Sequence, residues 1–524
     1  MVSQNTHFVV PPPAFDGIPL GLLPALHARG NPSRPAITHE GETISWAELD
    51  ARSTRRARRM QALGVGQDDF VTVGLPNSLE FYETSFAIWK LGATPNVVSP
   101  NLPAVELAAI LDLVRPRLLV CPQAIGAAAI DAASLASQAM LAAGDRSHEA
   151  LSANALPERV STYWKAMTSG GSTGRPKVIV DHMPGRWHPT IGMLGHQPHS
   201  VVLNPGPLYH NAPFSMVHGA LFVGSHVIDM RRFDALRALQ LIEQHRVEWM
   251  NLVPTMMHRI WRLPAEQREA FDLSSLKIVF HMASACPPWL KEKWLQWLGP
   301  QRIWELYGGT ERQGRTIISG EEWLAHPGSV GRVTADGNMR VLDEAGADCA
   351  TGMVGEIFFL PATGRNSTYH YVGAQAKARG DWESIGDLGY LDAEGYLYLV
   401  DRRTDLVISG GANIYPAEVE AALDAHPEIL SSAVIGLPDD DLGQRVHAII
   451  QIDAAKVDAA KAGAGASGGG GSGMEERIRE FLATRLARYK IPRSMEFVAT
   501  PLRDDAGKAR RSALREQRLP ASKT

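Results

Sequence analysis

The sequence predicts an α/β protein with a large N-terminal unit of layered α/β subdomains and a small α+β C-terminal unit. Two observations carry this prediction. Amphipathic stretches such as 47–63 and 81–91 alternate with short apolar runs such as 70–75, a pattern typical of helices that cover a largely parallel sheet. After about residue 356 the pattern changes to short strand-like runs with Gly and Asp turns.

Further apolar runs of strand length continue the alternation in the large unit. They lie at 117–121, 201–203, 249–252 and 278–282. We therefore expect an N-terminal domain over residues 1–402 and a C-terminal domain over residues 403–524.

The smaller unit shows its own succession of helix and strand patterns. A helix is expected over 416–426, strands over 432–436 and 446–452, and a second helix over 475–486. Between them, segment 454–473 is nearly all Ala, Gly, Ser and Lys, a composition that behaves as a flexible tether. A natural loop and an engineered linker both remain open for this segment.

Composition narrows the class of protein. The 524 residues are 45% hydrophobic and 21% charged, with a net charge of −4, so no global field favours nucleic acid or an anionic membrane. The basic tail after residue 475 has no aromatic stacking platform for nucleic acid. The three cysteines are far apart in sequence, which fits a reducing cytoplasm. No signal peptide and no apolar run of about 18 residues is visible, and a homodimer is compatible with the sequence.

The most informative segment is the loop 168–177, which contains three glycines and four hydroxyl residues. Glycines let successive backbone N–H groups turn toward one point, which makes a concave site for an anion. Ser169, Ser172 and Thr173 add hydroxyl donors, and Lys177 adds a positive charge. The apolar run after the lysine places the loop between two strands, unlike a Walker A loop. We interpret the loop as a pyrophosphate site, with a plain Gly/Ser turn as the alternative.

Polar groups suited to a nucleotide recur in four further places. Segment 307–311, Tyr-Gly-Gly-Thr-Glu, offers one carboxylate, which is sufficient for Mg²⁺ beside a triphosphate. Asp387 lies in a Gly-Asp turn and can accept both hydroxyls of a ribose, while Arg402 can pair with sugar or phosphate. Lys508 follows a glycine in a polar loop. Each motif alone has a plainer explanation as a turn, a surface ion pair or a solvated lysine.

In this order and at these spacings, the motifs resemble the adenylate-forming (ANL) superfamily of acyl-CoA synthetases, adenylation domains and luciferases. The resemblance spans nearly the whole chain. Segments 207–214 and 410–420 are most similar to bacterial fatty-acid, bile-acid and aryl acid–CoA ligases. It implies an AMP-binding N-terminal domain, a mobile C-terminal domain, and the use of ATP, Mg²⁺ and coenzyme A.

The resemblance also implies a role for each matching residue. The β and γ phosphates would be held by Ser169, Gly170, Gly171, Ser172, Thr173, Gly174 and Lys177. Thr310 and Glu311 would serve the phosphates and Mg²⁺, with Glu311 as the metal ligand. Ala283, Ser284 and Ala285 would flank the adenine, with Tyr307 on its other side. Asp387 and Arg402 would bind the ribose, His210 would gate the acyl pocket, and Lys508 would bridge the carboxylate and the α-phosphate.

The implied reaction activates a hydrophobic carboxylic acid as an acyl-adenylate with release of pyrophosphate, then transfers the acyl group to coenzyme A. An amine acceptor, as in amide bond synthetases, stays open because both acceptors share the first half-reaction. Loading of a carrier protein is a third alternative. Retention of Glu311 and Lys508 speaks against a non-catalytic homologue. No aspartate near Pro213 is available to pair an α-amino group, and fatty, aryl and steroid-like acids all remain open.

Three positions depart from the pattern of the superfamily. Thr404 occupies the hinge position, where Asp or Lys is usual, Val178 follows the loop lysine, where Gly is usual, and Ala285 stands where proline is common. We expect the first to affect the rate of domain rotation and the second to affect how the loop closes.

Overall fold

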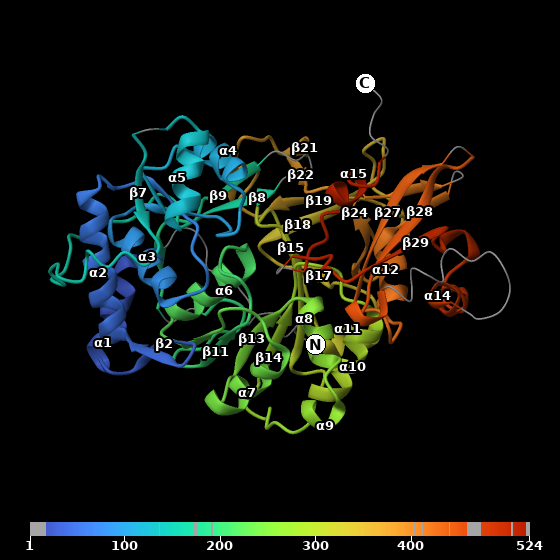
Figure 1. The fold of residues 1–524 in the computed structure, drawn as a ribbon, viewed down its shortest axis with the longest axis horizontal. Coiled ribbons are helices and arrows are strands. Elements are labelled where there is room, and N and C mark those ends of the chain that lie inside the picture. Colours follow the sequence, from blue (N-terminus) through green and yellow to red (C-terminus); the bar gives the residue numbers. More distant parts are fainter. Residues whose placement is uncertain are drawn as a thin grey trace.

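The computed structural model describes residues 17–135, 137–170, 176–189, 192–402, 405–409, 412–439, 441–457, 473–504 and 507–519. A large N-terminal unit carries three sheets, and a small C-terminal unit lies at one end of the molecule (Figure 1). The mixture of helices and sheets in a large and a small unit confirms the predicted fold class.

The first sheet of the large unit has nine strands in the order β17-β16-β15-β14-β13-β11-β12-β2-β3. Its six central strands, from β15 to β2, pair in parallel. The bounds are β2 Pro35–His39, β3 Glu42–Ser45, β11 Val201–Asn204, β12 His226–Asp229, β13 Trp249–Leu252, β14 Ile278–His281, β15 Ile303–Gly308, β16 Arg315–Ser319 and β17 Arg332–Val333.

The second sheet has seven strands in the order β20-β9-β8-β5-β4-β6-β7. The central strands β8, β5, β4, β6 and β7 are parallel, whereas β9 and β20 run antiparallel at one edge. The bounds are β4 Phe70–Val73, β5 Thr94–Val97, β6 Leu118–Cys121, β7 Ala139–Ala142, β8 Ala166–Gly170, β9 Pro176–Asp181 and β20 Tyr369–Val372. A short ladder joins β1 Ile18–Pro19 to β10 Arg186–Trp187.

Two helices join these sheets. Helix α3 contacts β4 and β5 of the second sheet, and α6 contacts β11 and β12 of the first. They meet through aromatic side chains, with Phe214 of α6 in edge contact with Phe81 and Trp89 of α3. Aromatic burial of this kind is the main stabilising term in a layered core.

The helices of the large unit begin mostly at prolines and hydroxyl residues. Ser45 and Glu48 form a reciprocal capping box at the start of α2, and Ser78 caps α3. The bounds are α1 Leu23–Gly30, α2 Trp46–Ala62, α3 Leu79–Lys90, α4 Ala104–Val114, α5 Gln123–Ala132, α6 Asn211–Phe222, α7 Ala235–His245, α8 Pro254–Trp261, α9 Ala265–Arg268, α10 Pro288–Leu298 and α11 Gly320–Ala325.

The third sheet is antiparallel and follows the order β21-β22-β19-β23-β24, with β18 paired to β19. Its strands are β18 Gly337–Leu342, β19 Gly355–Pro361, β21 Lys377–Arg379, β22 Trp382–Ser384, β23 Asp387–Leu391 and β24 Leu397–Arg402. This sheet accounts for the change of sequence pattern near residue 356.

The C-terminal unit has a three-stranded sheet in the order β27-β28-β29 and a separate hairpin, β25–β26. The elements are β25 Val407–Ser409, β26 Ala412–Ile414, α12 Pro416–Asp424, β27 Ser431–Asp439, β28 Gly443–Gln451, α14 Met474–Ala483, β29 Ser494–Val498 and α15 Arg511–Glu516. Arg262, after α8, donates hydrogen bonds to the carbonyl oxygens of Pro427 (3.0 Å) and Ile429 (2.5 Å), which joins the two units.

The predicted tether over 454–473 starts too early. Residues 454–457 are helical, and Val457 packs into the core of the C-terminal unit beside Met474 and Ile478. The prediction was wrong here because the one valine in this stretch has a core to enter. Gly473 is the N-cap of α14, and residues 458–472 lie outside the described part of the chain.

No helix in the described ranges combines the length and apolarity that crossing a membrane requires.

Candidate active site

A cleft of about 2300 Å³ is lined by residues of both units. The parallel strands β13, β14 and β15 end at this cleft, because the residues directly after them, at 253–256, 282–288 and 309–312, line it. Ligands of open parallel sheets bind at the carboxyl ends of the strands. The cleft is therefore where the predicted site residues should meet.

The glycine-hydroxyl loop connects two antiparallel strands, as predicted. Ser169 of β8 pairs with Lys177 of β9, and Gly170 pairs with Pro176. The side chain of Ser169 is not described, and Gly171, Ser172, Thr173 and Gly174 lie outside the described residues. Their contact with phosphate therefore stays a prediction.

The Lys177 ammonium is held between two groups at the cleft wall. Its Nζ donates a 3.0 Å hydrogen bond to the hydroxyl of Tyr371 and lies 3.3 Å from Oε1 of Glu311. The Tyr371 hydroxyl in turn donates to Glu311 Oε1 at 2.6 Å. Burial and the nearby Glu311 raise the pKa of Tyr371, so its hydroxyl stays protonated. Lys177 and Glu311 are thus brought together, with Tyr371 fixing both.

Glu311 is positioned by the turn that follows β15. A Cβ atom on Gly309 would lie 2.7 Å from Glu311 Oε2, so a larger residue there would displace the carboxylate from its present position. Glu311 is buried, and Thr310 lines the cleft beside it. The turn therefore presents one carboxylate and one hydroxyl to the cleft, as the motif predicts.

Asp387, Arg402 and Tyr307 form a second group. Asp387 and Arg402 are cross-strand partners at the ends of β23 and β24, and Arg402 Nε lies 3.2 Å from Asp387 Oδ1. The Tyr307 hydroxyl donates to Asp387 Oδ2 at 2.8 Å. Burial raises the pKa of the Asp387 carboxyl, while Arg402 acts in the opposite sense. Register and hydrogen bonding therefore hold this carboxylate at a fixed place in the cleft.

The segment 283–285 also borders the cleft, directly after β14. Ala283 has φ of +76°, a conformation that residues with a Cβ rarely adopt. Such backbone strain gathers at binding sites. His210 precedes α6 at its N-cap, lines the cleft, and has its ring centroid 4.7 Å from that of Tyr209.

Lys508 comes to the cleft from the C-terminal unit. The backbone N–H of Lys508 donates to Asp504 Oδ1 at 2.9 Å, which closes its loop. At Gly507, φ is +76°, and a Cβ there would lie 2.8 Å from Oγ1 of Thr255 in the large unit. The loop is therefore seated against the N-terminus of α8.

The electrostatics of Lys508 show which groups it faces. Burial lowers the pKa of its ammonium, and the positive charge of Arg402 lowers it further. The carboxylates of Asp504, Glu311 and Asp387 act in the opposite sense. The lysine thus lies within the field of the residues that the sequence pattern assigned to ribose and metal.

Two family models match this chain. The model of the AMP-binding enzyme matches residues 25–362, and that of the AMP-binding enzyme C-terminal domain matches residues 418–508. The chain belongs to the AMP-binding enzyme family. As in the sequence resemblance, a large AMP-binding domain is followed by a small C-terminal one.

The relatives of this AMP-binding enzyme include acid–CoA ligases. It is 29% identical over 489 residues to 2-succinylbenzoate–CoA ligase of Geobacillus kaustophilus, covering 92% of this chain and 95% of the relative. It is 31% identical over 491 residues to feruloyl-CoA synthase of an Amycolatopsis species, and the match covers 91% of this chain and 94% of the relative.

Solved structures share the fold of this AMP-binding enzyme. The o-succinylbenzoate CoA synthetase of Bacillus subtilis, in complex with its acyl-adenylate intermediate, superposes with a TM-score of 0.76 at 23% identity, covering 97% of this chain and all of the other. The amide bond synthetase McbA of Marinactinospora thermotolerans gives 0.74 at 22% identity, covering 96% and 100%.

The side chains of this AMP-binding enzyme fit ATP. Lys177, Arg402 and Lys508 supply positive charge around one space, and Asp387 brings a carboxylate that can accept hydrogen bonds from hydroxyl groups. Ala283, with its left-handed backbone conformation, borders the same space. The donor set is therefore that of a nucleotide with its phosphates.

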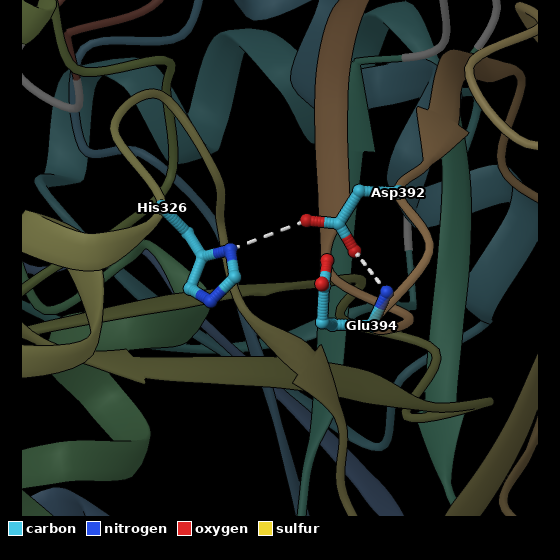
Figure 2. Close-up of side chains that lie close together, drawn as sticks. All are labelled: His326, Asp392 and Glu394. Atoms are coloured by element: carbon cyan, nitrogen blue, oxygen red, sulfur yellow. Dashed lines mark hydrogen bonds and ion pairs between the residues drawn. The ribbon is translucent and has the colours of Figure 1, made fainter.

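Glu311 is also suited to Mg²⁺, because this ion needs few protein oxygens when phosphates and waters complete its shell. Among the described residues, the cluster of three metal-ligating types is His326, Asp392 and Glu394 (Figure 2), and none of these lines the cleft. The Asp392 carboxylate already accepts hydrogen bonds from the backbone N–H of Glu394 and Tyr396 and lies 3.2 Å from His326 Nδ1. The cluster therefore closes a turn.

Sequence reasoning missed two residues that the geometry brings to the site. Tyr371 lies on β20 and carries no motif, so only the pairing of β20 with β9 reveals its place beside Lys177. Lys165 lies just before β8, lines the cleft and is buried. A lysine directly before an apolar strand indicates a buried cation, and lysine is rarely buried without a partner, so the sequence carried a signal for Lys165.

Proposed function

We propose that this protein is an ATP-dependent acid–CoA ligase that forms an acyl-adenylate and then an acyl-CoA. The observation that carries the proposal is the placement of Lys508 against the N-terminus of α8, within the field of Glu311, Asp387 and Arg402. A cation supplied by a separate small unit at a nucleotide site suits a reaction with two half-reactions. The family and its acid–CoA ligase relatives support the same reaction.

In the first half-reaction, an oxygen of the acid's carboxylate attacks the α-phosphorus of ATP, and the bond from that phosphorus to the bridging oxygen breaks. Pyrophosphate leaves with the bonding electron pair. Both reactants are anions, so Lys508 offsets their repulsion and stabilises the charge that develops in the transition state. Lys177 and the glycine-hydroxyl loop bind the departing pyrophosphate. Mg²⁺, held by Glu311, supplies further charge neutralisation when bound.

In the second half-reaction, the CoA thiolate attacks the acyl carbonyl carbon, and AMP leaves. We propose that the C-terminal domain, residues 403–524, rotates on the N-terminal domain, residues 1–402, between the two steps. Lys508 would then withdraw, and the segment 410–415 would approach the site. Gly410, Gly411 and the hinge residue Thr404 lie outside the described residues, so their roles remain predictions.

The remaining roles follow the placement of the side chains in the cleft. Asp387, Arg402 and Tyr307 would fix the ribose, and Ala283, Ser284 and Ala285 would border the adenine. Thr310 would bind phosphate, and His210 would close the acyl pocket beside Tyr209. These assignments are supported by the lining of one cleft by all of these residues.

A panel of fatty, aryl and steroid-like acids with ATP and Mg²⁺ tests the proposal. We expect acid-dependent release of pyrophosphate and, with CoA, an acyl-CoA detected by mass spectrometry. Each reaction is repeated with simple amines. Amide in place of thioester would make the enzyme an amide bond synthetase, and no acid-dependent pyrophosphate release would contradict both readings.

We further propose a cytoplasmic location, for which the free cysteines Cys121, Cys286 and Cys349 are support. A small-molecule acid, rather than nucleic acid, is the proposed partner. A homodimer is tested by light scattering during size-exclusion chromatography.

A further inference from the structure

Lys165 is a buried cation at the wall of the cleft. Its side chain is 2% exposed and lies one residue before β8, the strand that leads to the phosphate loop. Burying an ammonium group is costly unless other groups satisfy it. The groups that satisfy this ammonium therefore decide why a lysine is found here.

Two side chains of α6 hold the Lys165 ammonium. Nζ donates to Asn211 Oδ1 and, at 2.8 Å, to Ser215 Oγ. Asn211 and Ser215 are one helical turn apart, so they present their polar atoms on one face. An ammonium has three N–H donors, and no third acceptor among the described residues lies within hydrogen-bonding distance. One donor is thus available to a ligand.

The charges around Lys165 leave a net positive site. Asp181 is the nearest carboxylate, with Oδ2 3.8 Å from Nζ, beyond hydrogen-bonding distance. The other oxygen of Asp181, Oδ1, is paired with Arg312 at 2.7 Å. Two cations therefore share one carboxylate. An added anion beside Lys165 would neutralise the excess positive charge, and an oxygen acceptor would satisfy its remaining N–H donor.

Apolar and aromatic side chains also line the cleft wall near Lys165. The Trp164 ring lies 4.7 Å from Nζ, and Met216 and the residues leading into α6 line the same wall. Tyr209 and His210 immediately precede Asn211 in the chain. A pocket that is mostly apolar with a few placed polar groups selects ligands by those groups.

We propose that Lys165 selects acids that carry a second oxygen acceptor, whether hydroxyl, oxo or carboxylate, away from the reacting carboxylate. The inference rests on the proposed function, because it assigns the acyl substrate to this part of the cleft. An acid that lacks the acceptor would leave the ammonium donor unpaired, and a site built for a hydrogen bond discriminates against such an analogue.

Matched pairs of acids test this selection on each scaffold. The pairs are octanoic and octanedioic acid, 3-phenylpropionic acid and its 4-hydroxy derivative, and 5β-cholanic acid and its 3-hydroxy derivative. Binding to the full chain with AMP present is measured by calorimetry, and acid-dependent pyrophosphate release is measured separately. In the best-bound pair, we expect the oxygen-bearing acid to bind at least about tenfold more tightly.

Lys165→Met should remove that preference and leave the apolar member of the pair within about threefold of its wild-type Kd. The matched control is Lys90→Met, because Lys90 is also buried, pairs with Asp50 at 2.6 Å and does not line the cleft. Equal weakening of both acids by Lys165→Met, or no preference in the wild type, would overturn the inference.

A pH series on the wild type gives a test that needs no variant. Burial lowers the pKa of Lys165 to about 8. Asp181 has a lowered pKa and stays ionised, Arg312 is the other cation facing it, and His218 on α6 has its pKa lowered by burial to about 3. The preference for octanedioic over octanoic acid should therefore fall between pH 7 and 9. A flat preference would overturn the inference.

The two readouts separate the inference from the proposed function. Selective binding without pyrophosphate release would contradict the ligase assignment and leave the role of Lys165 standing. Pyrophosphate release with no preference within any pair would contradict the role of Lys165 alone.

Discussion

The Tyr307 hydroxyl donates a 2.8 Å hydrogen bond to Oδ2 of Asp387, a residue 80 positions later in the chain. This bond links β15, the strand that leads to Glu311, to the hairpin of β23 and β24 that carries Asp387. Burial raises the pKa of Tyr307 well above its ordinary value, so the hydroxyl stays a donor. The orientation of Asp387 thus depends on a side chain from a different sheet.

Tyr307→Phe should raise the KM for ATP by about tenfold, because a hydrogen bond to a charged group contributes about 1.5 kcal/mol or more and about 1.4 kcal/mol corresponds to tenfold. The maximal rate should change less. Steady-state pyrophosphate release measures both. Tyr396→Phe is the control, since Tyr396 does not line the cleft. An unchanged KM for ATP in Tyr307→Phe would remove this bond from nucleotide binding.

Lys508→Ala should lower the rate of acyl-adenylate formation by about 10²-fold or more, since it removes a cation from the transition state. Transfer from a supplied acyl-adenylate to CoA should be retained. Quenched-flow measurement of each half-reaction separates the two. Lys456→Ala, at a surface ion pair with Glu428, should change neither. Equal loss of both half-reactions would argue against a rotating C-terminal domain.

Tyr371→Phe should lower kcat/KM for ATP by about tenfold and raise the Mg²⁺ concentration needed for half-maximal rate. The change removes the hydroxyl that bridges Lys177 and Glu311, and leaves the carboxylate held less firmly, by Lys177 at 3.3 Å. A Mg²⁺ titration at fixed ATP tests it. Tyr489→Phe, at an exposed position, should match wild type. An unaltered Mg²⁺ dependence would mean that Tyr371 has no part in holding Glu311.

Asp401→Asn should change how stability depends on pH. Burial raises the pKa of Asp401 to about 6, although Arg511 acts in the opposite sense. The folded chain therefore binds this proton more tightly than the unfolded chain, and the stabilisation present below about pH 4 is lost as pH rises through 6.

Relative to wild type, Asp401→Asn should thus gain about 1–3 kcal/mol in the free energy of unfolding between pH 4.5 and 7. Urea unfolding at the two values measures this. Asp348→Asn is the control, because hydrogen bonds from Arg340 lower the pKa of Asp348, so this carboxyl is ionised across the whole window and its difference from wild type should stay flat. A pH-independent difference for Asp401→Asn would refute the assignment.

Deletion of residues 464–471 should leave activity within about twofold of wild type, since the Gly- and Ser-rich composition predicts a tether and tether length has little energetic effect. Val457→Asp should instead lower the melting temperature, because Val457 packs in the core of the C-terminal unit. Calorimetry and pyrophosphate release are measured on both variants. Loss of activity on deletion with unchanged stability would give the segment a functional role.

Much of this fold was predictable because its signals are local. Helix α3 and strand β4 follow from hydrophobic periodicity, and the two strands beside the glycine-hydroxyl loop follow from glycines bounded by apolar runs. The short helical turn at 454–457 was not predictable, because its formation depends on a distant core that Val457 enters.

The site was predictable where a motif gathers several groups in one loop, as at 307–311. It was not predictable where contacts cross between sheets. The sequence around Tyr371 does not predict that β20 pairs with β9. The sequence around Lys165 does not predict its hydrogen bonds to Asn211 and Ser215. Such partners are set by tertiary packing, which overrides local pattern.

Because Gly507 lies so close to Thr255, one small substitution could change how the Lys508 loop sits against the large unit. A single methyl group at position 507, as in Gly507→Ala, would act as a wedge that pushes the lysine loop away from α8. The added methyl group would spare every charged group. It would also leave accessible the proposed second arrangement, in which the segment 410–415 approaches the site. With preformed acyl-adenylates supplied as acyl donors, the variant would catalyse transfer to the acceptor without consuming ATP.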